Sequence, residues 1–262
     1  MKILGVIPAR MAATRFPNKP MAPILGMPMI GHCYLRSVLC SLMDDVYVAT
    51  CDKEIYDYIE SIGGKAIMTS DIHERATERT AEALLNIEAL NNGIKFDIVV
   101  MIQGDEPLVD PEMLREAATP LLDGDKIVSN LIATIPTQEE RENPNNVKVA
   151  VSINKQILYL SREAIPSNKK YSGHIDSYRQ LGLIAFSREA LLKFVALPTT
   201  PLEIIESIDM NRFLEHGIPI HSEITAYQAD SVDTPADLIR VIEKMLKDKL
   251  FDSYKRHVRD EG

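Results

Sequence analysis

The sequence has little cysteine and no excess of positive charge. Three cysteines, an odd number, occur in 262 residues, and Cys33, Cys40 and Cys51 show neither CxxC nor metal-ligand spacing. We therefore expect buried free thiols rather than a disulfide framework or a zinc site. Lys and Arg number 29 against 38 Asp and Glu, a formal net charge of −9. This negative net charge gives no indication of binding to nucleic acid or to an anionic membrane, both of which attract positively charged proteins.

Long apolar runs are missing as well. The first run, residues 3–8, is too short for the core of a signal peptide and is soon followed by Arg10. Nowhere do eighteen apolar residues occur in sequence, so we expect no membrane insertion and a cytosolic protein. The six histidines lack spacings such as HExxH, which removes the usual signal for a histidine metal site.

Strand-like runs alternate with amphipathic segments of helix length in the first half of the chain. The runs at residues 2–8, 45–50, 65–69 and 96–103 precede helical patterns at 28–42, 53–62, 77–90 and 111–122, in that order. This alternation predicts an α/β fold, with a mostly parallel sheet flanked by helices. Ligands of such sheets bind beyond the carboxyl ends of the strands, so the loops there are candidate sites.

The pattern changes from about Lys126 onward. Strand-like runs are now joined by polar loops rather than by long helices, which indicates an antiparallel or mixed lobe at about residues 130–200. Two helical stretches, 202–215 and 235–250, then surround a short strand within 218–227. We expect one domain over residues 1–262, with the lobe added to its main sheet.

The first candidate site is the loop "PARMAATRFPNK", residues 8–19. Arg10, Arg15 and Lys19 could converge on a polyphosphate, and the small residues between them let backbone N–H groups approach phosphate oxygens. The loop matches neither GxxxxGK[ST] nor GxGxxG, so a P-loop kinase and a Rossmann dehydrogenase lose their main support. On these residues alone, a solvated basic loop explains the pattern equally well.

Carboxylates follow two other strand-like segments. In "MIQGDEPLV", Asp105 and Glu106 come directly after an apolar strand and suit Mg²⁺, although a turn that caps the next helix is the alternative. In "SVDTPADL", Thr234 and Pro235 predict a helix N-cap, which by itself accounts for Asp233. A cationic loop with carboxylate-bound Mg²⁺ is what phosphoryl or nucleotidyl transfer requires.

Taken in order, the motifs resemble those of the 3-deoxy-manno-octulosonate (KDO) cytidylyltransferases. The resemblance runs from Lys2 to about Val241 and rests on "VIPARMAATRFPNKPM", "GMPMIGH", "VYVAT", "TERTAEA", "QGDEP", "NPNNVKV", "SREAIP", "LEIIE" and "VDTPADL". It implies a fold of the nucleotide-diphospho-sugar transferase type and transfer of CMP from CTP to a 2-keto-3-deoxy sugar acid, with release of pyrophosphate. It also implies a homodimer joined through the lobe and a product used in lipopolysaccharide or capsule biosynthesis.

The resemblance also implies roles for particular residues. Asp105 and Asp233 would hold Mg²⁺, which reverses the local interpretation of Asp233 as part of a cap. Arg10, Lys19 and Asp105 would be catalytic. CTP would be bound by Arg10, Arg15, Lys19, Arg75, Arg79 and Gln103. The acid substrate would be bound by Gln103, Lys148, Arg162, Gln180, Ile184 and Asp209.

Three segments depart from the family pattern. Arg75-Ala76 stands where the family usually has Ser-Gly, residues 180–184 (QLGLI) stand for His-Leu-Gly-Ile-Tyr, and Asp209-Met210 stands for Glu-Gln. Losing polar groups that read sugar hydroxyls retunes specificity. The acceptor is therefore KDO or a KDO-like acid, or else an amino-octulosonate, a nonulosonate or a smaller carboxylate or phosphonate. A catalytically inactive nucleotide-binding regulatory homologue is the alternative from another class.

Overall fold

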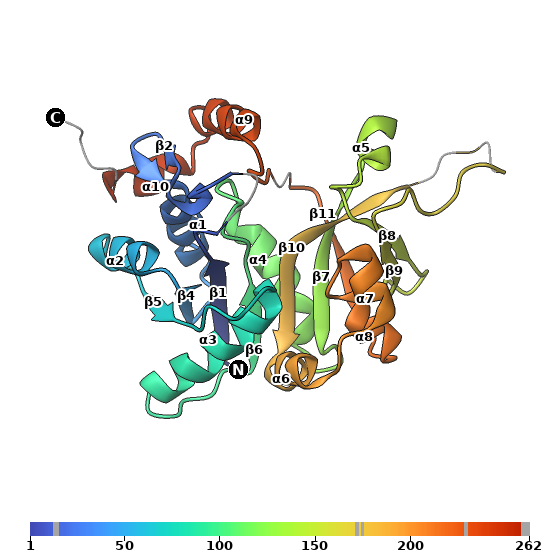
Figure 1. Cartoon of the computed structure of the whole chain (residues 1–262), viewed down its shortest axis with the longest axis horizontal. Coiled ribbons are helices and arrows are strands. Elements are labelled where there is room, and N and C mark those ends of the chain that lie inside the picture. Colours follow the sequence, from blue (N-terminus) through green and yellow to red (C-terminus); the bar gives the residue numbers. More distant parts are fainter. Residues whose placement is uncertain (13–15, 171–172, 174–175, 228–229, 258–262) are drawn as a thin grey trace. The chain divides into compact units, whose positions relative to one another are not determined.

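The computed structural model describes residues 1–12, 16–170, 173, 176–227 and 230–257 (Figure 1). The chain forms two compact units. Unit 1 comprises Met1–Arg115 and Ala229–Gly262, and unit 2 comprises Glu116–Gln228. Helix α4 (Pro111–Ala118) runs across the boundary.

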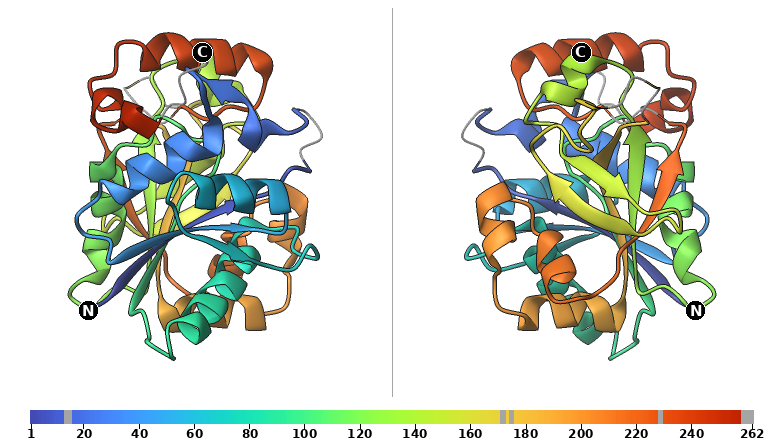
Figure 2. Two further views of the ribbon diagram at one scale, coloured as in Figure 1. Left: turned by 90° about the vertical axis from the view of Figure 1, so that its left-hand side faces the viewer. Right: turned by 90° about the vertical axis from the view of Figure 1, so that its right-hand side faces the viewer.

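Unit 1 is built on a parallel sheet whose strand order is β6-β1-β4-β5. Val6, in the middle of the sheet, pairs with Tyr47 on one side and Met101 on the other. Right-handed crossovers place α1 and α2 on one face of this sheet and α3 on the other (Figure 2). The bounds are β1 (Ile3–Ala9), α1 (Met29–Val38), β4 (Asp45–Thr50), α2 (Lys53–Ser61), β5 (Ala66–Met68), α3 (Ala76–Leu90) and β6 (Ile98–Met101).

Smaller elements complete unit 1. A two-stranded hairpin, β2 (Pro23–Ile24) and β3 (Met27–Pro28), turns through Leu25 and Gly26, both at positive φ. The 3-10 turn η1 (Lys19–Met21) precedes it, and α9 (Pro235–Met245), α10 (Phe251–Tyr254) and η3 (Lys255–His257) follow unit 2 in the chain. Thr234 caps α9 in a capping box with Asp237, which confirms the predicted N-cap.

Unit 2 contains a mixed sheet, as the sequence predicted. Strand β10 is antiparallel to β7 and β8, β9 is antiparallel to β8, and β11 is parallel to β7. The bounds are η2 (Thr119–Leu121), β7 (Val128–Thr134), α5 (Gln138–Glu142), β8 (Lys148–Val151), β9 (Ile157–Ser161), β10 (Tyr178–Ser187), α6 (Arg188–Ala196), α7 (Pro201–Glu206), α8 (Asn211–Glu215) and β11 (His221–Thr225).

Two expectations need correction. The predicted helix over 202–215 is two helices, because Ser207 adopts φ 53° at the end of α7 and so stops the helix. Of the three free cysteines, Cys33 and Cys40 are buried as expected, whereas Cys51 is only half-buried. None of the helices in the described part of the chain combines the length and apolar character needed to cross a bilayer.

His32 on α1 is a fully buried polar group in unit 1. Its Nε2 lies 2.8 Å from the carbonyl oxygen of Ile24, which can only accept, so Nε2 carries the proton. Its Nδ1, 3.1 Å from the Tyr254 hydroxyl, is then the acceptor. Burial lowers the pKa of His32 to about 4, and the nearby Arg36 contributes to this shift. The imidazole is therefore neutral in the folded protein at pH 7.

Replacing His32 with Leu should remove part of the pH dependence of stability. Between pH 6.5 and 4 the unfolded chain protonates His32 but the folded protein does not, so stability falls as pH drops through this window. The loss for this group is roughly 3 kcal/mol. Urea unfolding of both proteins at several pH values measures it. Equal slopes of stability against pH for the two proteins would contradict this assignment.

Candidate active site

A pocket lies in unit 1 at the carboxyl ends of β1 and β6 and beside the start of α3. Parallel strands end at one edge of the sheet, which is why loops distant in sequence meet there. The cavity has a volume of about 390 Å³. Seven residues predicted from the sequence line it: Arg10, Lys19, Arg75, Arg79, Gln103, Asp105 and Asp233.

Lys19 contacts both predicted metal ligands. Its Nζ lies 2.6 Å from Asp105 Oδ2 and 3.4 Å from Asp233 Oδ1. Burial by itself would lower the pKa of the Lys19 ammonium, but the two carboxylates outweigh this effect and raise the pKa above its usual value. Lys19 is therefore a cation at neutral pH, shared by two carboxylates from segments far apart in the chain.

A tight turn after β6 places Asp105 in the pocket. A Cβ on the preceding residue, Gly104, would lie 3.0 Å from the carbonyl oxygen of Pro8 and 3.2 Å from Ile30 Cδ1. A side chain at this position would therefore push the turn away from the end of β1 by a few tenths of an ångström. Glu106, the other carboxylate of the motif, is buried, with 6% of its surface exposed.

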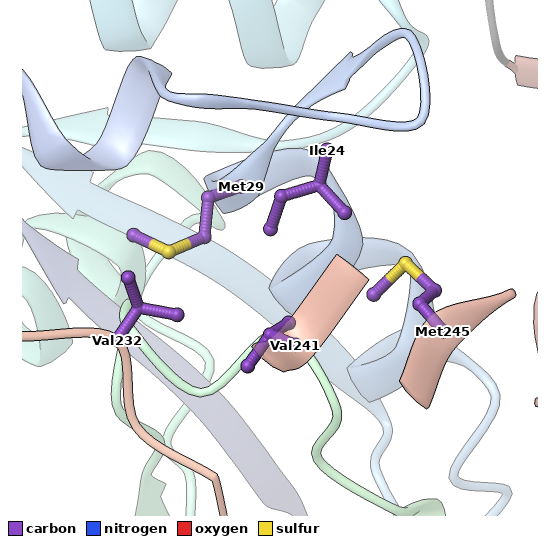
Figure 3. Close-up of a cluster of buried hydrophobic side chains, with 5 residues drawn as sticks. All are labelled: Ile24, Met29, Val232, Val241 and Met245. Atoms are coloured by element: carbon purple, nitrogen blue, oxygen red, sulfur yellow. The ribbon is translucent and has the colours of Figure 1, made fainter. Parts of the chain in front are cut away.

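Asp233 is brought beside Asp105 by the segment that leads into α9. The backbone N–H of Val232 donates to the carbonyl oxygen of Asp105 at 2.9 Å. The Val232 side chain belongs to a buried apolar cluster, the α9 cluster, in which α9 packs on the β2–β3 hairpin and α1 (Figure 3). Its other buried members are Ile24, Met29, Val241 and Met245. The same segment thus caps α9 and places the Asp233 carboxylate in the pocket.

The donor set fits Mg²⁺. Two carboxylates converge on a single cation, and hard carboxylate oxygens are preferred Mg²⁺ ligands. Among the residues that the structure describes, no group of three or more His, Cys, Asp or Glu could hold a metal ion by itself. That is compatible with Mg²⁺, which is usually bound by one or two carboxylates and takes its other ligands from water and substrate phosphates.

Further positive charge surrounds the pocket. Arg10 is exposed, and its Nη1 donates to the carbonyl oxygen of His73 at 3.4 Å. Arg75 occupies the N-cap position of α3 in an extended conformation, and Arg75 and Ala76 line the pocket, so the N-terminus of this helix borders it. Arg15, the third predicted loop cation, lies outside the described residues.

Arg79 is buried beneath the pocket, with 3% of its surface exposed. Its Nη1 donates to Thr69 Oγ1 at 2.5 Å and to the carbonyl oxygen of Ser70 at 3.0 Å. Glu82, one turn further along α3, accepts from the backbone N–H of Ser70 and pairs with His73. These two helix residues fasten the segment that carries His73 and Arg75, and a direct contact of Arg79 with CTP stays a prediction.

Lys148 is fully buried in unit 2. Its Nζ donates to the backbone carbonyl oxygens of Asn143 at 2.9 Å, Asn146 at 2.7 Å and Arg162. Burial lowers the pKa of this ammonium. The three bonds use all three of its N–H donors on the backbone. Lys148 therefore anchors the turn before β8 to the end of β9, and its contact with an acid substrate stays a prediction.

Arg162, at the end of β9, also binds backbone carbonyl groups. Its Nε donates to the carbonyl oxygen of Glu206 at 2.7 Å, Nη1 to that of Pro144 at 3.0 Å, and Nη2 to that of Ser207 at 3.3 Å. The Glu206 carboxylate in turn accepts from the Arg162 backbone N–H at 2.8 Å. Within the described part of the chain, these bonds use three of the five N–H donors of the guanidinium and hold Arg162 in place.

Gln180 is oriented by a buried asparagine. Asn130 Nδ2 donates to the carbonyl oxygens of Leu131, Leu181 and Leu183, at 3.0, 2.9 and 3.2 Å. Asn130 Oδ1 is therefore the acceptor for Gln180 Nε2, 2.6 Å away. The remaining residues of the predicted acid site differ in exposure. Ile184 is buried, with 2% of its surface exposed, and Asp209, between α7 and α8, is half-buried.

The comparison with known families decides the class of the protein. The sequence pattern of the cytidylyltransferase family matches residues 4–247. This chain belongs to the cytidylyltransferase family. The predicted fold class and the prediction of a nucleotidyltransferase are thereby confirmed.

Individual relatives of this cytidylyltransferase are similar over nearly their whole length. A 3-deoxy-manno-octulosonate cytidylyltransferase of Geobacter metallireducens is 38% identical over 256 residues, covering 94% of this chain and 98% of the relative. One of Desulfatibacillum aliphaticivorans is 39% identical over 250 residues, covering 95% and 100%. A structure of CMP:2-keto-3-deoxy-manno-octonic acid synthetase complexed with CTP superposes with a TM-score of 0.86 at 32% identity, covering 94% and 99%.

Sequence reasoning missed two side chains of this cytidylyltransferase that orient site residues. Glu82 lies mid-helix in α3, where an acidic residue looks like ordinary helix surface. Asn130 lies in the otherwise apolar strand "IVSNLIATIP", and a lone amide in such a strand was a usable signal, because a buried amide must find hydrogen-bond partners.

Proposed function

We propose that this cytidylyltransferase transfers CMP from CTP to the anomeric hydroxyl of a 2-keto-3-deoxy sugar acid, KDO or a KDO-like acid, and releases pyrophosphate. The observation that carries the proposal is the convergence of Lys19, Asp105 and Asp233 in a pocket that Arg10 and the start of α3 also border. The names of the relatives, and the CTP complex of the similar synthetase, support the choice of nucleotide and acid.

Positive charge at the pocket would bind the triphosphate. Arg10 and Lys19, with Arg15 from the same loop, would hold the β- and γ-phosphates and offset the charge that grows on the leaving pyrophosphate. The N–H groups at the start of α3 favour an anion at the same place. Gln103, Arg75 and Arg79 complete the nucleotide side in this proposal.

Asp105 and Asp233 would hold Mg²⁺. When bound, Mg²⁺ supplies Lewis-acid chemistry, which lowers the pKa of a hydroxyl and neutralises phosphate charge. The protein's own contribution is orientation. The Val232 N–H bond to the Asp105 carbonyl oxygen and the α9 cluster keep the two carboxylates on one side of the pocket.

The residues of unit 2 that the resemblance assigns to the acid substrate would bind it, and the same role for Gln103 rests on the resemblance alone. The guanidinium of Arg162 is fixed by three carbonyl oxygens and still has N–H groups to offer a carboxylate. Lys148, Gln180, Ile184 and Asp209 belong to the same proposal, Lys148 as an anchor of Arg162. A homodimer joined through the lobe at about residues 130–200 is also part of it.

Replacing Asp105 with Ala should lower the rate of pyrophosphate release from CTP and KDO by about a hundredfold or more, because one of two carboxylates for the metal is lost. A coupled pyrophosphate assay measures the rate. Asp230→Ala is the matched control, since Asp230 lies three residues before Asp233 but pairs with Lys244 on α9. Unchanged turnover by Asp105→Ala would contradict the proposed function.

The orientation of Gln180 favours a second candidate acceptor. Because Asn130 takes the Gln180 amide nitrogen, the Gln180 carbonyl oxygen is the end turned away from Asn130. This carbonyl oxygen can accept a hydrogen bond from a donor group of the substrate, and an ammonium group offers three N–H donors. An amino-octulosonate is therefore the second candidate, on the premise that position 180 faces the acid.

A panel of acids tests this candidate. We expect kcat/KM for the amino-octulosonate to exceed that for KDO by about tenfold or more. Gln180→Leu should reduce this preference, since an unmatched hydrogen bond costs about 1–3 kcal/mol. Val149→Ile, a conservative change in β8, is the control for disturbance of unit 2. KDO turnover at ordinary enzyme rates, with no better acid in the panel, would contradict the amino-octulosonate as substrate but would not contradict cytidylyl transfer.

A further inference from the structure

We propose that Lys19 is a placeholder for the metal ion: its ammonium occupies the oxygens of Asp105 and Asp233 until the nucleotide arrives, and then moves to the phosphates. The inference rests on the proposed function and deepens it. It makes the binding of metal and of nucleotide interdependent, so that a divalent ion binds weakly to the protein alone and tightly together with CTP.

Lys19 contacts the two carboxylates that would bind the metal. Its Nζ is 2.6 Å from Asp105 Oδ2 and 3.4 Å from Asp233 Oδ1, so it bridges one oxygen of each proposed ligand. Mg²⁺ binds carboxylate oxygens at about 2.0–2.1 Å and carries twice the charge. An ammonium left within about 4 Å of such an ion would be strongly repelled. Lys19 and the metal therefore compete for the same place.

The structure allows the side chain to leave without movement of the backbone. Lys19 begins the turn η1, where Asn18 before it has φ 59° and Pro20 follows it. Two backbone bonds close this turn, from Met21 N to the Asn18 carbonyl oxygen and from Ala22 N to that of Lys19, at 2.9 and 3.0 Å. The backbone is thus pinned, whereas the lysine stem has four rotatable bonds.

The pocket gives the displaced ammonium a destination. Lys19 lines the same cavity as Arg10 and the start of α3, the groups that would bind a triphosphate. While Lys19 is in place, one positive charge compensates two carboxylates that would otherwise repel each other. When a metal–CTP complex enters, the metal takes over this compensation and Lys19 compensates phosphate charge instead. The Lys19 ammonium and the metal ion then each have an anionic partner both before and after CTP binds.

Metal binding to the nucleotide-free protein provides the test, with Mn²⁺ as the spectroscopic probe for Mg²⁺. Lys19→Met should bind Mn²⁺ about tenfold more tightly than the wild type, because the competing charge is gone. Lys19→Arg, which keeps the charge, should stay weak, as should Lys244→Met, which removes a lysine paired with Asp230 away from the pocket. Adding Asp105→Asn to Lys19→Met should abolish the gain and so locate the ion.

Equal or weaker Mn²⁺ binding by Lys19→Met than by the wild type would overturn the placeholder role. Lys19→Gln serves as a second variant if Lys19→Met does not fold, and urea unfolding checks both. The proposed function fails separately: a wild type that releases no pyrophosphate with any acid refutes cytidylyl transfer and leaves the Mn²⁺ comparison valid. An active wild type with no Mn²⁺ gain in Lys19→Met refutes the placeholder alone.

Discussion

The contact between the Lys19 ammonium and the carboxylates of Asp105 and Asp233 is the interaction on which the pocket depends. It joins Lys19 to residues that lie 86 and 214 positions later in the chain. Each partner alone is an ordinary charged residue, Lys19 in the short turn η1 and the two aspartates in segments between a strand and a helix. Together, in the function proposed above, they would form a site at which a divalent metal ion replaces the lysine ammonium when CTP binds.

Much of unit 1 serves this contact. The parallel sheet delivers two of the segments to one edge, and Gly104 lets the turn after β6 pack against the carbonyl oxygen of Pro8. The third segment arrives only after the chain has completed unit 2, and the α9 cluster fixes it there (Figure 3). Apolar packing thus positions a polar group that does not belong to the core itself.

Local patterns were sufficient for the parallel sheet, its helices and the mixed lobe, because alternation of strand and helix periods records which faces are buried. They also made Lys19 and Asp105 candidate site residues, and the structure places both in one pocket. Asp233 was different: Thr234 and Pro235 explain their segment as a helix cap, and no local signal shows that the same segment packs beside Asp105. Only the resemblance to a family predicted Asp233 as a ligand of Mg²⁺.

Other details were beyond sequence reasoning because they depend on which partner a group finds. The sequence shows that residue 148 is a lysine, but not that three carbonyl oxygens enclose it. It shows Gln180 in place of a histidine, but not that Asn130 dictates which end of the amide is presented. The break at Ser207 is similar, because serine rarely adopts a left-handed backbone and its presence gives no signal of the φ of 53° found there.

A double-mutant cycle between Lys19 and Asp233 tests the central claim most directly. The values of kcat/KM for pyrophosphate release are compared for Lys19→Met, Asp233→Asn, the double variant and the wild type. We expect strong coupling, with the double variant losing little more activity than the more damaged single variant, because both residues act in one unit. Fully additive losses would show that the two residues act independently and would contradict this claim.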